Sequence, residues 1–236
     1  MTSPATTADI KANVARVRDR IARACDRAGR SPSDVTLIAV SKTWPAGSVL
    51  EAAAAGITDF GENRVQEALP KVAAVNVATS PTSVFAHGTN PTWHFIGHLQ
   101  SNKVRDALSI ARFIHSVDSE KLLRVISSNA EAPVEIFLEV NVGGEESKFG
   151  FVPEQVTGAV ALARSLPHIR LAGLMTVAPR VSNPEEARPY FRQLAELARE
   201  HGLPHLSMGM TEDFEVAIEE GATHVRVGRA IFGERQ

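Results

Sequence analysis

Lys42 stands at the end of an apolar run that is typical of a buried strand. The run extends from Leu37 to Val40 and is followed by Ser41 and Lys42 in the stretch LIAVSKTWPAG. Lysine is seldom buried unless it is paired or functional. Removal from water disfavours the charged ammonium and leaves more of the nucleophilic amine, which can bond to a carbonyl carbon as a Schiff base. The simpler alternative is a lysine that pairs with Glu62 or with a bound phosphate.

Two glycine-containing stretches near the C-terminus could bind an anion. The stretch SMGM offers the hydroxyl of Ser207 and the backbone N–H groups around Gly209. In RVGRAIFG, Gly228 comes directly before a predicted short helix, and free N–H groups at a helix start attract anions. Glycine also lets the backbone approach a ligand closely. Either stretch alone could merely turn the chain, but the two together favour a phosphate site.

An arginine adds a permanent cation to this set. In THVRVG, Val225 and Val227 point to one face of a predicted strand and Arg226 points to the other. An inward-facing guanidinium needs a partner. A lysine, an arginine and a phosphate site around one pocket suit pyridoxal 5'-phosphate, whose aldehyde would bond to Lys42 and whose ring nitrogen would face Arg226.

The elements that must position these residues alternate along the chain. The β-rich runs cover residues 35–42, 57–63, 92–98, 112–118, 134–142, 170–178, 204–210 and 223–229. The helical patterns between them cover residues 46–55, 63–75, 99–109, 119–129, 153–166, 184–201 and 212–220. The Thr/Ser/Pro/Asn-rich stretch 76–92 is expected to be an exposed loop.

An amphipathic helix over residues 8–28, ended by Gly29, precedes this alternation. Its apolar residues recur at steps of three and four, and Cys25 lies close to them as an expected buried hydrophobe. We therefore predict an α/β fold: a single-domain (β/α)8 barrel over residues 35–233 with a lead-in helix at 8–29. A doubly wound open sheet is the alternative, because periodicity alone cannot show closure.

Polar residues and glycines end most of the predicted strands. In a (β/α)8 barrel these ends meet at one rim, where the active or binding site lies. The residues at the strand ends are Lys42, Asn63, His98, Asp118, Asn141, Met175, Thr176, Ser207, Gly209, Arg226 and Gly228. The sequence therefore predicts a ligand site at this rim.

Composition excludes several classes of protein. The formal net charge of -2 gives no indication of nucleic-acid binding, and no apolar run reaches the length of a membrane span. A single cysteine and no apolar segment of a signal peptide favour the cytoplasm. His94 and His98 would lie about 13 Å apart on a strand, too far to share a metal, so no metal site is expected.

Motifs across residues 37–233 resemble those of the pyridoxal phosphate homeostasis protein family, of the YggS type. They read AVSKT, FGEN, VQEA, WHFIGHLQSNK, HSVDS, EVNVGGEESKFGF, GLMTVAP and LSMGMTEDFEVAIEEGATHVRVGRAIFG. This family is similar to the N-terminal barrel domain of alanine racemases. The resemblance implies binding of pyridoxal phosphate without clear turnover, and a part in cofactor supply and in balanced amino-acid and keto-acid pools.

The resemblance also implies roles for individual residues. Lys42 would carry the cofactor covalently as a Schiff base, and Arg226 would face the pyridine nitrogen. The other residues implied at the site are Ser207, Gly209, Gly228 and Arg229 (by its backbone N–H) at the phosphate, Asn63 and Met175 along the ring, and His94 and His98 at the mouth or its support. Two departures are Arg64, where many relatives have tyrosine, and Thr211, where serine is common.

Three functions remain open from the sequence: a cofactor carrier or homeostasis protein, a weak amino-acid racemase, and a sugar-phosphate enzyme without a standing Schiff base. A cation at the ring nitrogen weakens the ring as an electron sink and argues against a transaminase. A two-base racemase needs a second acid or base, yet the only tyrosine, Tyr190, lies in a helical pattern predicted outside the rim. Lys148 is the next lysine for transient cofactor contact, unless it pairs with Glu145 or Glu146. We expect a monomeric binding protein that could supply enzymes requiring pyridoxal phosphate.

Overall fold

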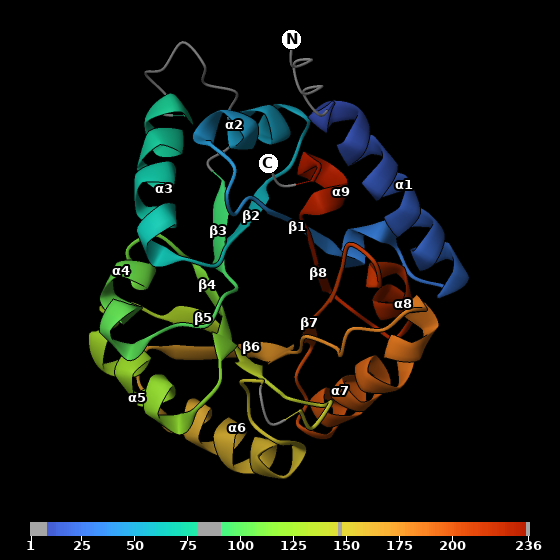
Figure 1. Cartoon of the computed structure of the whole chain (residues 1–236). Coiled ribbons are helices and arrows are strands. Elements are labelled where there is room, and N and C mark those ends of the chain that lie inside the picture. The colour runs from blue at the N-terminus through green and yellow to red at the C-terminus, as the bar shows by residue number, and fades with distance from the viewer. Residues whose placement is uncertain (1–8, 80–90, 146–147, 235–236) are drawn as a thin grey trace.

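Eight parallel strands close into a barrel in the computed structural model of the chain, which describes residues 9–79, 91–145 and 148–234. The strands are β1 Thr36–Val40, β2 Asp59–Glu62, β3 Thr92–Phe95, β4 Phe113–Val117, β5 Val134–Glu139, β6 Ile169–Met175, β7 His205–Met210 and β8 His224–Val227. β1 pairs with β2 on one side and with β8 on the other, which closes the ring (Figure 1). The (β/α)8 prediction is confirmed, and closure excludes the open doubly wound sheet.

Helices surround the strands on the outside of the barrel (Figure 1). They are α1 Ile10–Arg27, α2 Ala46–Ala54, α3 Val65–Thr79, α4 Val104–Leu108, α5 Glu120–Asn129, α6 Val156–Ser165, α7 Arg188–Glu200, α8 Phe214–Glu219 and α9 Arg229–Phe232. Short 3₁₀ turns at Ser101–Lys103, Pro153–Gln155 and Pro184–Ala187 lead into α4, α6 and α7. The predicted helices are therefore present, and several predicted strands end a few residues early, because their polar last residues bend into the loops.

The expected loop over residues 76–92 is wrong at its start, whereas the strand after it begins at residue 92 as predicted. α3 continues to Thr79 and β3 begins at Thr92. Val75 is fully buried on the same face as Val72, so the helical pattern continues past residue 75. Residues 80–90 of the expected loop lie outside the described residues.

The barrel has an aliphatic outer layer and a polar, aromatic interior. Val225 and Val227 point outward into the main hydrophobic core, whereas Arg226 lies between them on the inner face, as the alternation predicted. Phe137 and Met175 belong to a separate, smaller apolar cluster. Branched aliphatic side chains usually fill such an interior. The polar groups in this one are removed from water, so each needs a hydrogen-bond partner.

α1 packs against α8 and α9 on the outside of the barrel. Its apolar stripe is buried, and Cys25 is fully buried as expected. Arg27 pairs with Glu219 at 2.7 Å, while Arg188 on α7 contacts Glu219 at 2.6 Å and Glu220 at 2.9 Å. Tertiary packing thus brings arginines of α1 and α7 to these two glutamates of the α8 end.

Candidate functional site at the barrel mouth

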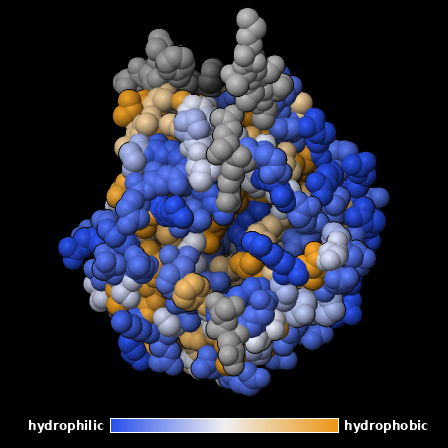
Figure 2. Space-filling model, viewed as in Figure 1, coloured by the Kyte–Doolittle hydropathy of each residue, from blue (hydrophilic) through white to orange (hydrophobic). Residues whose placement is uncertain are grey.

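The ends of β1 and β8 lie side by side at the mouth of the barrel. Ile38 is in register with Arg226, and Lys42 follows the end of β1. A Cβ atom at Gly228 would lie 3.2 Å from the carbonyl oxygen of Val40, so this close approach favours glycine. Figure 2 shows this face hollowed near its centre, with mostly hydrophilic residues around the hollow. Lys42 and Gly228 thus follow neighbouring strands at this mouth.

The turn that follows β1 rests on a buried network of polar groups. Lys71 of α3 donates from Nζ to the carbonyl oxygen of Ser41 at 2.8 Å and to Oε1 of Glu62 at 2.7 Å. The hydroxyl of Ser41 donates to the same Glu62 oxygen at 2.7 Å. Thr43 has a left-handed φ of 69°, and its N–H donates to Glu67. Lys71 also contacts Glu67 at 3.0 Å, so one lysine ties both carboxylates to this turn.

This network holds the backbone on both sides of Lys42. Burial raises the pKa of Glu62 against the opposing hydrogen bonds from Lys71 and Ser41. Burial alone would also raise the pKa of Glu67, but hydrogen bonds from Lys71 and Thr43 lower it below its ordinary value. Glu62, the sequence-predicted alternative partner of Lys42, is therefore engaged by Lys71. In the sequence, the only indication of this network was the spacing of Glu67 and Lys71, which lie four residues apart on a predicted helix and can therefore form an ion pair.

Arg226 is a buried cation bound to neutral oxygen atoms. Its side chain donates to Oγ of Ser207 at 2.7 Å and to the carbonyl oxygen of Thr176 at 2.8 Å, and the residue is 4% exposed. Burial lowers its pKa to about 10, while the charges of Asp213 and Glu139 oppose this change. Burying an ion without a contacting counter-charge costs free energy. Buried charges with perturbed pKa values are concentrated at functional sites.

The predicted phosphate ligands differ in what they offer. Ser207 is fully buried, and its hydroxyl is already bonded to Arg226 and His115. Gly209 has a φ of 88°, and a Cβ atom there would lie 2.6 Å from Cβ of Ala217, so close packing on α8 explains this glycine. The side chain of Arg229 pairs with glutamates at the surface. Its backbone N–H, in the first turn of α9, has no acceptor within the helix.

Asn63 follows β2 and Met175 ends β6, both at the rim of the barrel. The side-chain oxygen of Asn63 is buried and has no hydrogen-bond partner among the described residues. A Cβ atom on Gly97 would lie 2.3 Å from the Asn63 carbonyl oxygen, so the neighbouring loop packs tightly on this backbone. Met175 is 1% exposed and packs with Phe137. An orphaned amide oxygen is a polar group that a bound ligand could satisfy.

A carboxylate at the mouth was missed from the sequence. Glu139 is the last residue of β5, and burial together with repulsion from Asp118 raises its pKa to about 7, against attraction by Arg226. Asp118 contacts Nδ1 of His98 at 2.9 Å, and the ring of His98 stacks on Phe149. His98 lies beside the rim, as expected. The only signal for Glu139 was its position in the predicted strand EIFLEVNV.

We expect Glu139 to make the protein less stable as the pH rises from about 5 to about 7. The folded protein keeps this carboxyl protonated up to about 7, whereas its ordinary pKa is 4.5. The folded state thus binds more protons in this window, and stability falls by up to about 1.4 kcal/mol per pH unit. Urea unfolding at several pH values measures the slope. The variant Glu139→Gln should flatten it, and an unchanged slope would contradict the assignment.

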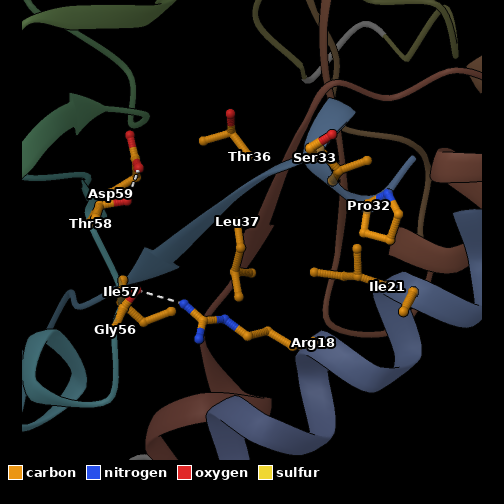
Figure 3. Close-up of a pocket in the computed structure, with 12 residues that line it drawn as sticks. Arg18, Ile21, Pro32, Ser33, Thr36, Leu37, Gly56, Ile57, Thr58 and Asp59 are labelled. Atoms are coloured by element: carbon orange, nitrogen blue, oxygen red, sulfur yellow. Dashed lines mark hydrogen bonds between the residues drawn. The ribbon is translucent and has the colours of Figure 1, made fainter. Parts of the chain in front are cut away.

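A cavity of about 600 Å³ lies away from this mouth, at the N-terminal ends of β1 and β2 (Figure 3). Arg18 of α1 borders it and donates to the carbonyl oxygen of Gly56 at 2.6 Å. Asp59, at the start of β2, also lines it. Binding sites of such barrels lie at the other end of the strands, so we assign the cofactor site to the mouth.

The described part of the chain offers neither a metal site nor a membrane span. No group of three or more His, Cys, Asp or Glu residues there is arranged to hold a metal ion. None of the described helices is both long enough and apolar enough to cross a membrane. Lys148 pairs with Glu145 at 2.6 Å, which was one of its two predicted partners.

Comparison with known proteins agrees with the barrel. Residues 9–236 match the family model of the alanine racemase N-terminal domain. The fold, the rim and this match define a barrel of the alanine racemase N-terminal domain class. Within that class, the chain belongs to the pyridoxal phosphate homeostasis protein family, and the resemblance seen in its motifs is confirmed.

Relatives in this family match over almost their full length. A pyridoxal phosphate homeostasis protein of Aquifex aeolicus is 44% identical over 232 residues, which cover 94% of this chain and 97% of the relative. That of Pseudomonas aeruginosa is also 44% identical, over 231 residues and 96% of each chain. The structure of PipY from Synechococcus elongatus PCC7942 with pyridoxal phosphate bound has a TM-score of 0.80 at 33% identity, covering 95% of this chain and 100% of that one.

Proposed function

We propose that this protein binds pyridoxal 5'-phosphate at the barrel mouth, held as a Schiff base on Lys42, and acts in cofactor homeostasis without robust turnover. The observation that carries the proposal is the buried guanidinium of Arg226, which lies inside the barrel on the strand next to the one that leads to Lys42. A cation in such a place is stabilised by a ligand with a lone pair or a negative charge. The PipY relative with bound pyridoxal phosphate supports the choice of ligand.

The chain's own groups account for the binding. Nζ of Lys42 would attack the aldehyde carbon, and the aldehyde oxygen would leave as water. Arg226 would direct N–H groups toward the pyridine nitrogen and keep it unprotonated. Gly228 and the first backbone N–H groups of α9 would receive the phosphate, with Asn63 at the edge of the ring. When bound, the cofactor supplies a carbonyl group and an electron-withdrawing ring.

A weak racemase is the second candidate, and Glu139 is the observation that favours it. Racemisation by two bases needs a group opposite the lysine that can exchange a proton near neutral pH. Glu139 has a pKa of about 7 at the mouth. Tyr190 instead lies on α7 and packs against the outer core. Slow interconversion of alanine enantiomers that Glu139→Gln abolishes would favour this candidate over a pure carrier.

An absorbance spectrum with borohydride reduction and peptide mass mapping tests the proposed function. We expect a near-visible band that reduction bleaches, with the added mass on Lys42. A protein that stays colourless after addition of pyridoxal phosphate would overturn the proposal and leave the phosphate-binding barrel without a Schiff base. Added mass on Lys148 would support binding of the cofactor but would assign the covalent bond to Lys148 instead of Lys42.

Replacing Arg226 should alter the bound cofactor. Arg226→Glu removes the cation and places a carboxyl where the ring nitrogen is proposed to lie, so we expect a shifted absorbance band and binding weakened about tenfold or more, which equals about 1.4 kcal/mol. Arg226→Lys keeps the charge but loses the forked geometry, so its effect should be smaller. Arg164→Glu, on the outer helix α6, is the control. Identical spectra for both Arg226 variants and the wild type would refute the placement.

The cellular setting is also part of the proposal. We propose a monomer in the cytoplasm that transfers pyridoxal phosphate to apoenzymes requiring it. Sedimentation measures the oligomeric state. Transfer is tested by mixing the loaded protein with such an apoenzyme and following the recovery of enzyme activity. The control is the apoenzyme mixed with free pyridoxal phosphate at the same concentration.

A further inference from the structure

A continuous chain of hydrogen bonds crosses the interior of the barrel. Nη1 of Arg226 contacts Oγ of Ser207 at 2.7 Å, and this oxygen lies 2.8 Å from Nδ1 of His115. Nε2 of His115 is 2.9 Å from Nδ1 of His94, and Nε2 of His94 is 2.9 Å from Oδ1 of Asp59. Five residues from five different strands therefore link the mouth to the opposite end of the barrel.

The donors in this chain all point the same way. Arg226 can only donate, so Oγ of Ser207 accepts, and its single hydrogen is left for Nδ1 of His115. A neutral His115 then carries its proton on Nε2 and donates it to Nδ1 of His94. His94 in turn donates from Nε2 to the carboxylate of Asp59. Every atom in the chain is satisfied with both histidines neutral and protonated on Nε2.

The reverse direction is disfavoured at both ends. It would require Asp59 to donate a proton, yet hydrogen bonds from His94 and Thr58 overcome the effect of burial and lower the pKa of Asp59. It would also leave the hydroxyl hydrogen of Ser207 without an acceptor among its contacts in the described residues. Burial lowers the pKa of His94, and that of His115 well below its ordinary value, so neither ring is doubly protonated near neutral pH.

Aromatic packing holds both imidazole rings in the plane that the chain needs. His94 stacks on Phe113 with ring centroids 4.6 Å apart, and His115 stacks on Phe137 at 4.3 Å. The ring centroids of His224 and His115 are 5.9 Å apart, but His224 is hydrogen-bonded to Thr223 and is not part of the hydrogen-bond chain. Burial lowers the pKa of His224 to about 3. His94 was expected near the mouth or its support, and the structure places it inside the barrel.

We propose that Asp59, His94 and His115 are positioning residues that lock Ser207 and Arg226 in one hydrogen-bonded arrangement for the ring nitrogen of the cofactor. Asp59 sets the direction from the far end, where its side chain is 20% exposed and lines the cavity of Figure 3. The hydroxyl of Ser207 is thereby kept as an acceptor for Arg226. The donor-to-acceptor direction of these hydrogen bonds is a property of the protein without cofactor. Only the effect of this direction on the cofactor rests on the proposed function.

Nitrogen-15 NMR of histidine-labelled protein without cofactor tests the direction of the chain. Near neutral pH we expect His94 and His115 as neutral rings protonated on Nε2. Asp59→Asn, which keeps an acceptor oxygen, should preserve this tautomer, whereas Asp59→Leu should lose the single tautomer of His94. A ring protonated on Nδ1 in the wild type, or one unchanged tautomer in Asp59→Leu, would overturn the inference.

A matched pair of variants tests the effect on the cofactor. His115→Phe keeps the stacking on Phe137 but breaks the chain, so we expect binding of pyridoxal phosphate to weaken about tenfold and its absorbance band to shift. His224→Phe, a neighbouring ring outside the chain, should change neither. Equal behaviour of the two variants would refute the positioning role. If His115→Phe does not fold, Asp59→Leu replaces it. A wild type that binds no cofactor would refute the proposed function alone, because the NMR result does not depend on it.

Discussion

Lys42→Ala should fold normally and lose the near-visible absorbance of the bound cofactor completely. Alanine has no amine, so no Schiff base can form, and borohydride should fix no mass to the protein. The side chain lies in the turn after β1 and is only partly buried, so its removal leaves no sizeable cavity in the core. Spectra of the purified variant with added pyridoxal phosphate, beside an unchanged urea unfolding curve, make the measurement.

Lys103→Ala is the matched control for this experiment. Lys103 is a partly exposed lysine that ends a 3₁₀ turn before α4, with Asp106 at 4.0 Å. It should retain the full absorbance band and the added mass on Lys42. A Lys42→Ala protein that keeps its band would show that another lysine bonds the cofactor, and mass mapping of that variant would identify it.

Lys71→Met should destabilise the protein by about 3–5 kcal/mol, the usual cost of removing one partner from a buried ion pair. Lys71 and Glu62 have side chains 5% and 3% exposed and contact each other at 2.7 Å. Methionine would leave the buried carboxylate of Glu62 with only the hydroxyl of Ser41 as a partner. The change in urea midpoint, at an unchanged slope, gives the loss.

A second variant separates charge from packing in this network. Lys71→Met combined with Glu62→Gln removes both charges, so it should recover a substantial part of the lost stability. Lys103→Met, at the exposed pair with Asp106, should cost less than about 1 kcal/mol. A loss of that small size for Lys71→Met would contradict the role assigned to the network. The double variant should also slow Schiff-base formation, because the turn that carries Lys42 is then held less firmly.

The periodicity of the chain was sufficient to predict a parallel sheet covered by helices, either as a barrel or as an open doubly wound sheet. Apolar runs of strand length, separated by helical patterns, can bury both faces of a parallel sheet in few other ways. The same alternation placed Arg226 on the inner face, because adjacent strand residues point in opposite directions. Periodicity could not predict closure of the barrel, because closure depends on the pairing of β1 with β8, and these strands are far apart in the sequence.

The site was predicted less completely than the fold. Residues at strand ends could be collected at one rim by the geometry of the barrel alone, and this set included Lys42, Asn63 and Gly228. The contacts of Ser207 were not foreseen, because its partner His115 comes from a strand 92 residues away in the sequence. Glu139 was passed over for a similar reason: its raised pKa comes from burial and from Asp118, and neither is a local property of the sequence.

The sequence by itself determined the alternating elements, the lysine at the end of the first strand, the arginine inside the last strand and the family to which the chain belongs. These follow from local spacing and residue type, which act along the chain. Only the tertiary structure decided that Lys71 supports the turn of Lys42, and that Arg226 is linked through two histidines to Asp59. Those arrangements depend on distances across the barrel and on the exclusion of water, and both exist only after the strands have closed.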